Sequence, residues 1–258
     1  MPLRSLQRIF IGIIATGLSL YVTVCVGLFA FQRSLIYFPR PRSDSADSAL
    51  MTLRAGAADV RVSTHPHPGA AALIYFGGNA EDVSQDVPFL VEAFPEGAVY
   101  ALHYPGYGGS SGSPSQQAIF AAALALVDRV MAEHSSVTIV GRSLGSGVAV
   151  WVASRRPISR LVLVTPFDSL ADPAAQQYPF LPVRLLLRDR FQSWRYAPQV
   201  TAPTRIIVAG EDELVPRASS DRLRTRFRAG LVTYVVMPGF GHNTIQNCPG
   251  YWGLLSKQ

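Results

Sequence analysis

A serine stands at the centre of the stretch from Val137 to Trp151, which reads V-T-I-V-G-R-S-L-G-S-G-V-A-V-W. A β-branched run ends at Gly141, Ser143 follows within the pattern G-x-S-x-G, and small and apolar residues continue at helical spacing. This order predicts a strand, a sharp turn and a helix, with the serine at the turn. Flanking glycines suit such a turn because the strained serine backbone must lie close to the adjoining helix and strand. We therefore predict that Ser143 is a catalytic nucleophile; the alternative is a tight turn without a catalytic role.

The same pattern occurs a second time around Ser110, between Gly108 and Gly112. That copy lies in the Gly-, Ser- and Pro-rich run from Pro105 to Ser115, with no strand pattern directly before it and no helix pattern beginning at the serine. The motif supplies a nucleophile only between a strand and a helix. We therefore expect Ser110 to be a loop residue.

A serine hydroxyl needs a general base, and the base needs an acid that orients it. His242 lies in a glycine-rich loop directly after a predicted strand, and we predict that it is the base. The other four histidines fit less well: His65 and His67 lie in a Pro-flanked turn, His103 lies within a predicted strand, and His134 ends a predicted helix.

Three adjacent acidic residues, Glu211, Asp212 and Glu213, follow another predicted strand. We predict that Asp212 orients His242 and that its two neighbours are solvated loop charges. Asp168, at the end of the preceding predicted strand, is the remaining alternative. The acid and histidine loops both follow strand carboxyl ends, where active sites of open α/β sheets lie.

Two backbone amides are predicted to stabilise a substrate oxyanion. The amide of Leu144 is at the N-terminus of the predicted helix, where the helix dipole is positive. The second donor is the amide of Asn79, in the loop Gly77-Gly78-Asn79-Ala80, because paired glycines let the backbone approach a bound carbonyl. A glycine loop of this kind also suits phosphate, but the accompanying serine, acid and histidine favour acyl transfer.

Alternating strand and helix patterns predict an α/β fold with a doubly wound, mostly parallel sheet. Strands are expected at 59–63, 71–76, 98–104, 136–140, 160–164, 205–208 and 231–237, and helices at 81–93, 115–134 and 216–227, besides the one after Ser143. Residues 167–200 are longer than an ordinary connecting loop and contain an apolar patch at 181–187. This segment is expected to form a small cap near the site; the alternative is a helix on the sheet edge.

The N-terminal region contains 23 residues without a charge, from Ile9 to Phe31. A helix of that length spans a hydrocarbon core of about 30 Å with slight tilt. We predict a retained membrane anchor over residues 1–32, followed by a linker at 39–48 within the main domain, 33–258; a cleaved signal peptide is the alternative. Arginines flank the helix on both sides, so the positive-inside rule leaves open which side of the membrane the domain occupies.

The chain has 258 residues, a net charge of +6 and two cysteines, Cys25 and Cys248. The cysteines imply neither a disulfide framework nor a cysteine-based metal site, and we expect no cofactor or metal. A basic run comprises Arg217, Arg222, Arg224, Arg226 and Arg228. No nucleic-acid motif accompanies it, so we expect a solvated face, or one near anionic lipid head groups, and no nucleic-acid partner.

These motifs together resemble the α/β-hydrolase superfamily, and most of all its small, N-terminally membrane-anchored branch, which includes abhydrolase-domain depalmitoylases and bacterial inner-membrane hydrolases. The similarity extends from the run Q-R-S-L-I-Y-F-P at 32–39 to near the C-terminus. The family's Gly-x-x-Asp-x-x-Val-Pro-like pattern falls on Asp212, and its Gly-His on His242. The departures are Gly77 where the family's loop has histidine, His103 where a later family motif has aspartate, and an abbreviated strand region before Ala71.

The resemblance implies a serine hydrolase that cleaves ester, thioester or amide bonds through an acyl-enzyme, in a single-pass protein of a bacterial inner membrane. The anchor and the apolar insertion favour lipid-like or acylated substrates, and the bilayer is the expected partner of the N-terminal helix. A serine peptidase or a hydrolase of small esters is the alternative. A hydrolase-fold scaffold that binds without catalysis is the alternative from another functional class.

Overall fold

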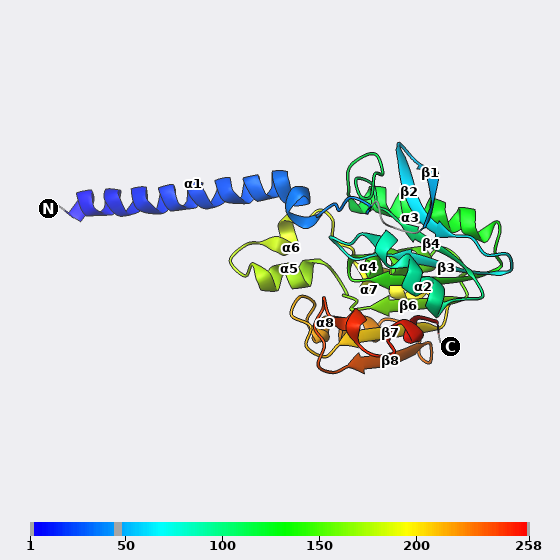
Figure 1. Cartoon of the computed structure of the whole chain (residues 1–258). Coiled ribbons are helices and arrows are strands. Elements are labelled where there is room, and N and C mark those ends of the chain that lie inside the picture. Colours follow the sequence, from blue (N-terminus) through cyan, green and yellow to red (C-terminus); the bar gives the residue numbers. More distant parts are fainter. Residues whose placement is uncertain (1–2, 44–47, 257–258) are drawn as a thin grey trace.

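Eight strands form one sheet in a computed structural model that describes residues 3–43 and 48–256 (Figure 1). The strands are β1 (Ala49–Ala55), β2 (Ala58–His65), β3 (Ala71–Phe76), β4 (Ala98–Leu102), β5 (Ser136–Arg142), β6 (Arg160–Val164), β7 (Thr204–Ala209) and β8 (Val232–Met237). Their order across the sheet is β1-β2-β4-β3-β5-β6-β7-β8. The β1–β2 and β2–β4 pairs are antiparallel and the other five pairs are parallel. The predicted α/β fold with a mostly parallel sheet is confirmed.

The expectation of an abbreviated strand region before Ala71 is wrong, because β1 and β2 form a complete antiparallel hairpin that pairs Ala49 with Thr64 and Ala55 with Ala58. Gly56, with φ of +59°, permits the tight turn between them. β1 is an edge strand whose residues are largely exposed or half-buried. It therefore lacks the continuous apolar run by which the buried strand β3 is recognised in the sequence.

Helices pack on both faces of the sheet. The helices of the described chain are α1 (Leu3–Ile36), α2 (Val87–Ala93), α3 (Gln116–Met131), α4 (Leu144–Ala153), α5 (Ala171–Gln177), α6 (Val183–Leu186), α7 (Ser193–Tyr196), α8 (Arg217–Arg224) and α9 (Tyr251–Ser256), with 3₁₀ turns η1 (Val83–Gln85), η2 (Ala197–Gln199) and η3 (Ile245–Asn247). Buried residues of α3, α4 and α8 share one core, and those of α2 and α9 share the core on the opposite face. The helix expected over 81–93 is divided into η1 and α2, because Asp82 caps η1 and a proline occupies the first turn of α2.

Helix α1 extends away from the sheet as a single element of 34 residues (Figure 1). From Gln7 to Ile36 it is apolar and long enough to cross a membrane, by length and composition, and side chains from Gln7 to Val24 are exposed. It passes residue 32, the expected end of the anchor, without a break and ends at Ile36. Residues 44–47 of the expected linker lie outside the described residues.

The insertion at 167–200 contains α5, α6, α7 and η2, and its first part lies beside the C-terminal half of α1 (Figure 1). Arg33 Nε is 3.0 Å from Asp189 Oδ2, and Tyr37 Oη donates to the same carboxylate at 3.0 Å. The apolar patch at 181–187 lines a shared groove with α1. The insertion is thus joined to the anchor helix as well as to the sheet.

The basic run lies on α8 and in the residues that follow it. Its contacts are Arg217 with Asp221, Arg222 with Asp168 and Asp172, Arg224 over the ring of Tyr234, Arg226 over the ring of Trp194, and Arg228 with the Pro198 carbonyl. These arginines therefore help to hold α8 against its surroundings.

His103, the residue that departs from the family's aspartate, is buried directly after β4 and only 2% exposed. Its Nε2 lies 2.9 Å from Ser63 Oγ. A Cβ at Gly108, where φ is +55°, would lie 2.0 Å from the His103 ring. Burial lowers the pKa of His103 to about 4, with the charge of Asp82 opposing this shift and that of Arg42 adding to it.

This histidine is expected to make the free energy of unfolding depend on pH. In the unfolded chain His103 binds a proton at its ordinary pKa near 6.5, whereas in the folded chain it does so only near pH 4. The stability that the folded chain has at neutral pH is therefore retained above pH 6.5 and is progressively lost as the pH falls from 6.5 towards 4. At pH 5 the loss is about 2 kcal/mol. Urea unfolding of the detergent-solubilised protein at pH 7.5 and 5 measures it. The variant His103→Gln should lose less stability over that interval, and an equal loss in both proteins would contradict the assignment.

Candidate functional site

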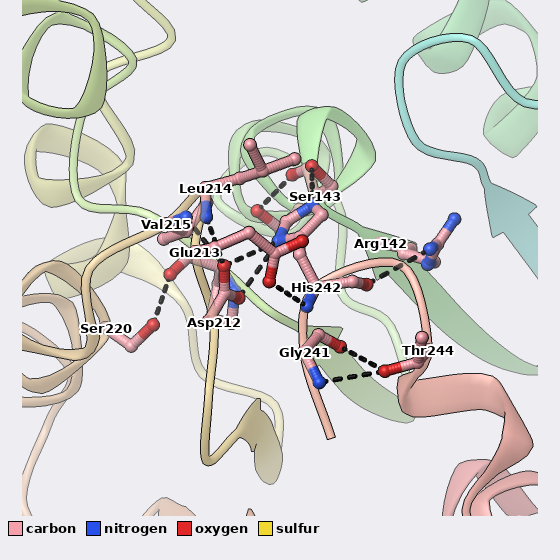
Figure 2. Close-up of polar contacts among 12 residues, drawn as sticks. Arg142, Ser143, Asp212, Glu213, Leu214, Val215, Ser220, Gly241, His242 and Thr244 are labelled. Carbon is pink, nitrogen blue, oxygen red and sulfur yellow. Dashed lines mark hydrogen bonds and ion pairs between the residues drawn. The ribbon is translucent and has the colours of Figure 1, made fainter. Parts of the chain in front are cut away.

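The carboxyl ends of β3, β5, β7 and β8 lie at one edge of the sheet, since these strands run parallel. The loops that follow them contain Asn79, Ser143, Asp212 and His242. Figure 2 shows the last three side chains pointing toward one another from three different loops. Residues separated by up to 99 positions in the chain thus meet at one place.

The turn at Ser143 has the strained geometry that its glycines suggest. Ser143 has φ of 49° and ψ of −115°, a conformation that costs on the order of 1–3 kcal/mol for a residue with a side chain. Its amide donates to the Val164 carbonyl at 2.9 Å. A Cβ at Gly141 would lie 2.4 Å from the Gly145 carbonyl oxygen, and one at Gly145 would lie 1.9 Å from that of Phe76. Both positions therefore require glycine, and the hydroxyl is held at the N-terminus of α4.

His242 bridges the serine and the acid. Its Nε2 is 2.8 Å from Ser143 Oγ, and its Nδ1 is 2.9 Å from Asp212 Oδ2 and 3.0 Å from Oδ1. The amides of Leu214 and Val215 donate to Asp212 Oδ1 at 3.0 and 2.7 Å, which fixes the carboxylate. The side chains of His242 and Asp212 are each 5% exposed. With the Nδ1 proton directed at Asp212, Nε2 is free to accept the serine proton.

The other acidic candidates have different surroundings. Glu213 was expected to be a solvated loop charge, but its Oε2 accepts a hydrogen bond from the His242 amide at 3.1 Å. It helps to hold the histidine loop. Asp168 lies elsewhere, where it accepts from Ser219 Oγ at 2.6 Å and pairs with Arg222 Nε at 2.6 Å.

The loop after β3 passes beside the serine. A Cβ built at Gly78 would lie 3.6 Å from the Cβ of Ser143. The Gly78 amide donates to Glu81 Oε2 at 2.8 Å, whereas no acceptor within the described part of the chain pairs with the Asn79 amide. The Leu144 amide belongs to the first turn of α4, where N–H groups lack helical partners. These two amides remain the predicted oxyanion donors.

Two site residues, Arg142 and Glu81, are absent from the sequence-based prediction. They form an ion pair in which the side chains are only 12% and 10% exposed. Arg142 also donates to the His242 carbonyl at 3.3 Å and to Gln246 Oε1 at 3.2 Å. Arg142 thus ties together the serine turn, the loop after β3 and the histidine loop. The available sequence signal is a charged residue next to the serine in an otherwise apolar stretch.

Burial and neighbouring charges shift the pKa values of Glu81, Arg142 and the nearby Asp86. Burial opposes ionisation of Glu81, but Arg142 and the hydroxyl of Tyr75 hold the pKa of Glu81 below its ordinary value. Burial and the Glu81 charge raise the pKa of Asp86 well above its ordinary value. Burial would lower the pKa of Arg142, yet the Glu81 carboxylate raises it above the ordinary value. The pair is therefore ionised at neutral pH.

The second G-x-S-x-G serine has a structural role. Ser110 Oγ donates to the His103 carbonyl at 2.9 Å and accepts from the Arg61 amide at 2.8 Å, which holds the loop against β2. His134, which follows α3, is buried between Tyr100 Oη at 3.1 Å and the Gly69 carbonyl at 2.9 Å. Within residues 3–43 and 48–256, no three His, Cys, Asp or Glu side chains are grouped so as to hold a metal ion.

Comparisons with known proteins agree with this fold. The family model described as alpha/beta hydrolase fold matches residues 72–195. The uncharacterized protein Rv2307c of Mycobacterium tuberculosis is 36% identical over 251 residues, which cover 90% of this chain and 86% of that protein. The alpha/beta hydrolase domain-containing protein WAV2 of Arabidopsis thaliana is 25% identical over 244 residues, 80% of this chain and 77% of its own.

Solved structures show the same fold. The esterase Pf2001 of Pyrococcus furiosus superposes with a TM-score of 0.67 at 20% identity, over 85% of this chain and 96% of that one. The matched family model, the relative named alpha/beta hydrolase domain-containing protein WAV2 and the shared sheet lead to one assignment. The chain belongs to the alpha/beta hydrolase fold family.

Proposed function

We propose that this chain is a membrane-anchored serine hydrolase that cleaves ester, thioester or amide bonds, with lipid-like or acylated molecules as its first substrate class. The hydrogen-bonded series of Ser143, His242 and Asp212 carries the proposal. A binding scaffold has no need of a serine, a base and an acid aligned at these distances. The esterase name of the Pyrococcus furiosus relative is consistent with this class of reaction.

In the first step, Ser143 Oγ attacks the substrate carbonyl carbon as His242 Nε2 takes the hydroxyl proton. Asp212 holds the imidazole by its Nδ1 and stabilises the imidazolium that forms. The negative charge on the former carbonyl oxygen is balanced by the amides of Leu144 and Asn79. The carbon–leaving-group bond then breaks, and His242 returns its proton to the departing alcohol, thiol or amine.

In the second step, water attacks the acyl-enzyme carbonyl as His242 again takes the proton. The bond between Ser143 Oγ and the acyl carbon breaks, the serine recovers its proton, and a carboxylic acid leaves. With the substrate, these groups and one water molecule supply every bond that forms or breaks and every proton that moves in the two steps.

Covalent labelling of the full-length protein in detergent tests this proposal. A fluorophosphonate probe should modify Ser143, as located by peptide mass spectrometry, and the same protein should hydrolyse p-nitrophenyl butyrate. The matched control is Ser110→Ala, which alters the other G-x-S-x-G serine and should leave Ser143 labelling in place. Well-folded protein that shows neither labelling nor hydrolysis would favour the scaffold alternative.

A further inference from the structure

An apolar groove of about 450 Å³ lies between the C-terminal end of α1 and the insertion. Gln32 is a polar residue of its lining, and its side chain is engaged: Nε2 donates to the Leu186 carbonyl at 3.2 Å and Oε1 accepts from the Arg188 amide at 2.7 Å. The remaining lining is largely apolar. It includes Leu28, Ile36, Phe38, Tyr178, Leu181 and Leu186.

The length of α1 places this groove at the edge of the membrane. At about 1.5 Å per residue, residues 7–20 cover only about 21 Å, which is less than the ~30 Å of a hydrocarbon core. The helix must therefore supply part of its span from residues beyond Tyr21. Those residues lie alongside the insertion, because Tyr21 Oη donates to the Phe180 carbonyl at 3.1 Å.

The tip of the insertion suits contact with lipid. Phe180 is 88% exposed, which is unfavourable in water and favourable at a bilayer surface. Its carbonyl, which would lack water there, is satisfied by Tyr21 Oη. The amide of Leu181 donates to the Tyr178 carbonyl at 3.1 Å, so the tip also pairs its own backbone. The groove therefore opens beside a lipid-facing tip.

The inner end of the groove is joined to the site. Asn79 Nδ2 donates to the Ile36 carbonyl at 2.5 Å, and Asn79 Oδ1 accepts from the Phe38 amide at 3.1 Å. Ile36 and Phe38 both line the groove, and Asn79 is the predicted oxyanion residue beside Ser143. Two residues at the inner end of the groove are thus hydrogen-bonded to the loop that borders the serine.

We infer that this groove binds one acyl chain of a membrane glycerolipid, which enters sideways from the adjoining leaflet and presents its ester to Ser143. The inference rests on the proposed function and deepens it by naming the substrate class. The groove takes an alkyl chain because its exposed lining is apolar, and the leaflet supplies the chain because one wall of the groove is the anchor helix itself.

Activity in vesicles tests the inference. Full-length protein is reconstituted in phosphatidylcholine vesicles, and hydrolysis of vesicle-borne monopalmitoylglycerol is compared with that of soluble p-nitrophenyl butyrate. Leu186→Trp and Leu28→Trp fill the groove from its two walls and should lower the ratio of the long-chain to the short-chain rate at least tenfold. The control Leu185→Trp changes a neighbouring side chain that is 76% exposed and outside the groove lining, and should keep the ratio within twofold.

Binding is measured separately from catalysis. Ser143→Ala protein is reconstituted with phosphatidylcholine carrying a diazirine in its acyl chain, irradiated and mapped by peptide mass spectrometry. Adducts are expected on the peptides that contain Leu181 and Leu186. Adding Leu28→Trp should reduce their yield at least fivefold, whereas adding Leu20→Trp, on the exposed part of α1, should not.

The outcomes separate the two proposals. A wild-type protein that hydrolyses neither ester and resists the fluorophosphonate would refute the proposed function, while the adduct pattern would still decide the groove. Unchanged rate ratios or adduct yields in both groove variants would overturn the inference. Cleavage of a palmitoylated peptide in the same vesicles without cleavage of monopalmitoylglycerol would also overturn it, since the chain would then come from an acylated polypeptide.

Discussion

Replacing Ser143 with alanine is expected to lower kcat for p-nitrophenyl butyrate by about 10⁶-fold, the scale of loss when a nucleophile of this kind is removed. Alanine keeps the Cβ and removes only the oxygen that lies 2.8 Å from His242 Nε2. The backbone at φ of 49° is equally strained with either residue, so the melting temperature should change little. Steady-state kinetics and thermal unfolding of the same preparation measure both effects.

A second substitution makes this prediction sharper. If Ser143 and His242 act as a unit, the double variant Ser143→Ala/His242→Ala should be no slower than Ser143→Ala alone. A residual rate in Ser143→Ala above a tenth of the wild-type rate would mean that another group performs the attack. Independent, additive losses in the double variant would contradict the hydrogen-bonded unit.

Removing the charge of Arg142 is expected to destabilise the fold by about 3–5 kcal/mol, because the buried Glu81 carboxylate would lose its counter-charge. Arg142→Gln should also reduce kcat by about 10²-fold with a smaller change in KM, since its bond to the His242 carbonyl positions the base rather than the substrate. Urea unfolding and steady-state kinetics check the two parts.

The double variant Arg142→Gln/Glu81→Gln is the matched control. It removes both charges, so its loss of stability should be several kcal/mol smaller than the sum of the single losses. The cost of Arg142→Gln alone should also shrink as the pH falls. Arg142 holds the pKa of Glu81 below its ordinary value, so the ion pair stabilises the wild-type fold at any pH above that ordinary value. This stabilisation is lost in acid as Glu81 becomes protonated. In the variant the unpaired Glu81 carboxyl is already protonated there, so it no longer carries a buried charge. A pH-independent cost would show that the ion pair is not its cause.

Local patterns predicted the central sheet and the serine turn. Strands such as β3 and β6 are buried on both faces, so their residues form continuous apolar runs that are visible without a structure. The turn at Ser143 is equally local, because the strand, the two glycines and the helix that define it lie within 15 residues. The chain order of serine, acid and histidine, each after a strand, limited the choice of partners.

The tertiary structure decided which groups meet. The resemblance to the family pattern already favoured Asp212 among three adjacent acids, but only the loop geometry directs Glu213 to the His242 amide while Asp212 contacts Nδ1. Arg142 and Glu81 are separated by 61 positions, and no local pattern pairs them. The docking of α1 on the insertion likewise depends on distant partners, as in the contacts of Tyr21 with Phe180 and of Arg33 with Asp189.

The class of sheet and the strand–turn–helix at Ser143 follow from the sequence alone, because short-range periodicity predicts the strands and helices and the two glycines indicate the tight turn. What holds the three loops together and where an apolar groove opens were decided by packing between segments far apart in the chain. Such contacts form only when folding brings distant segments together, so no single stretch of the sequence predicts them.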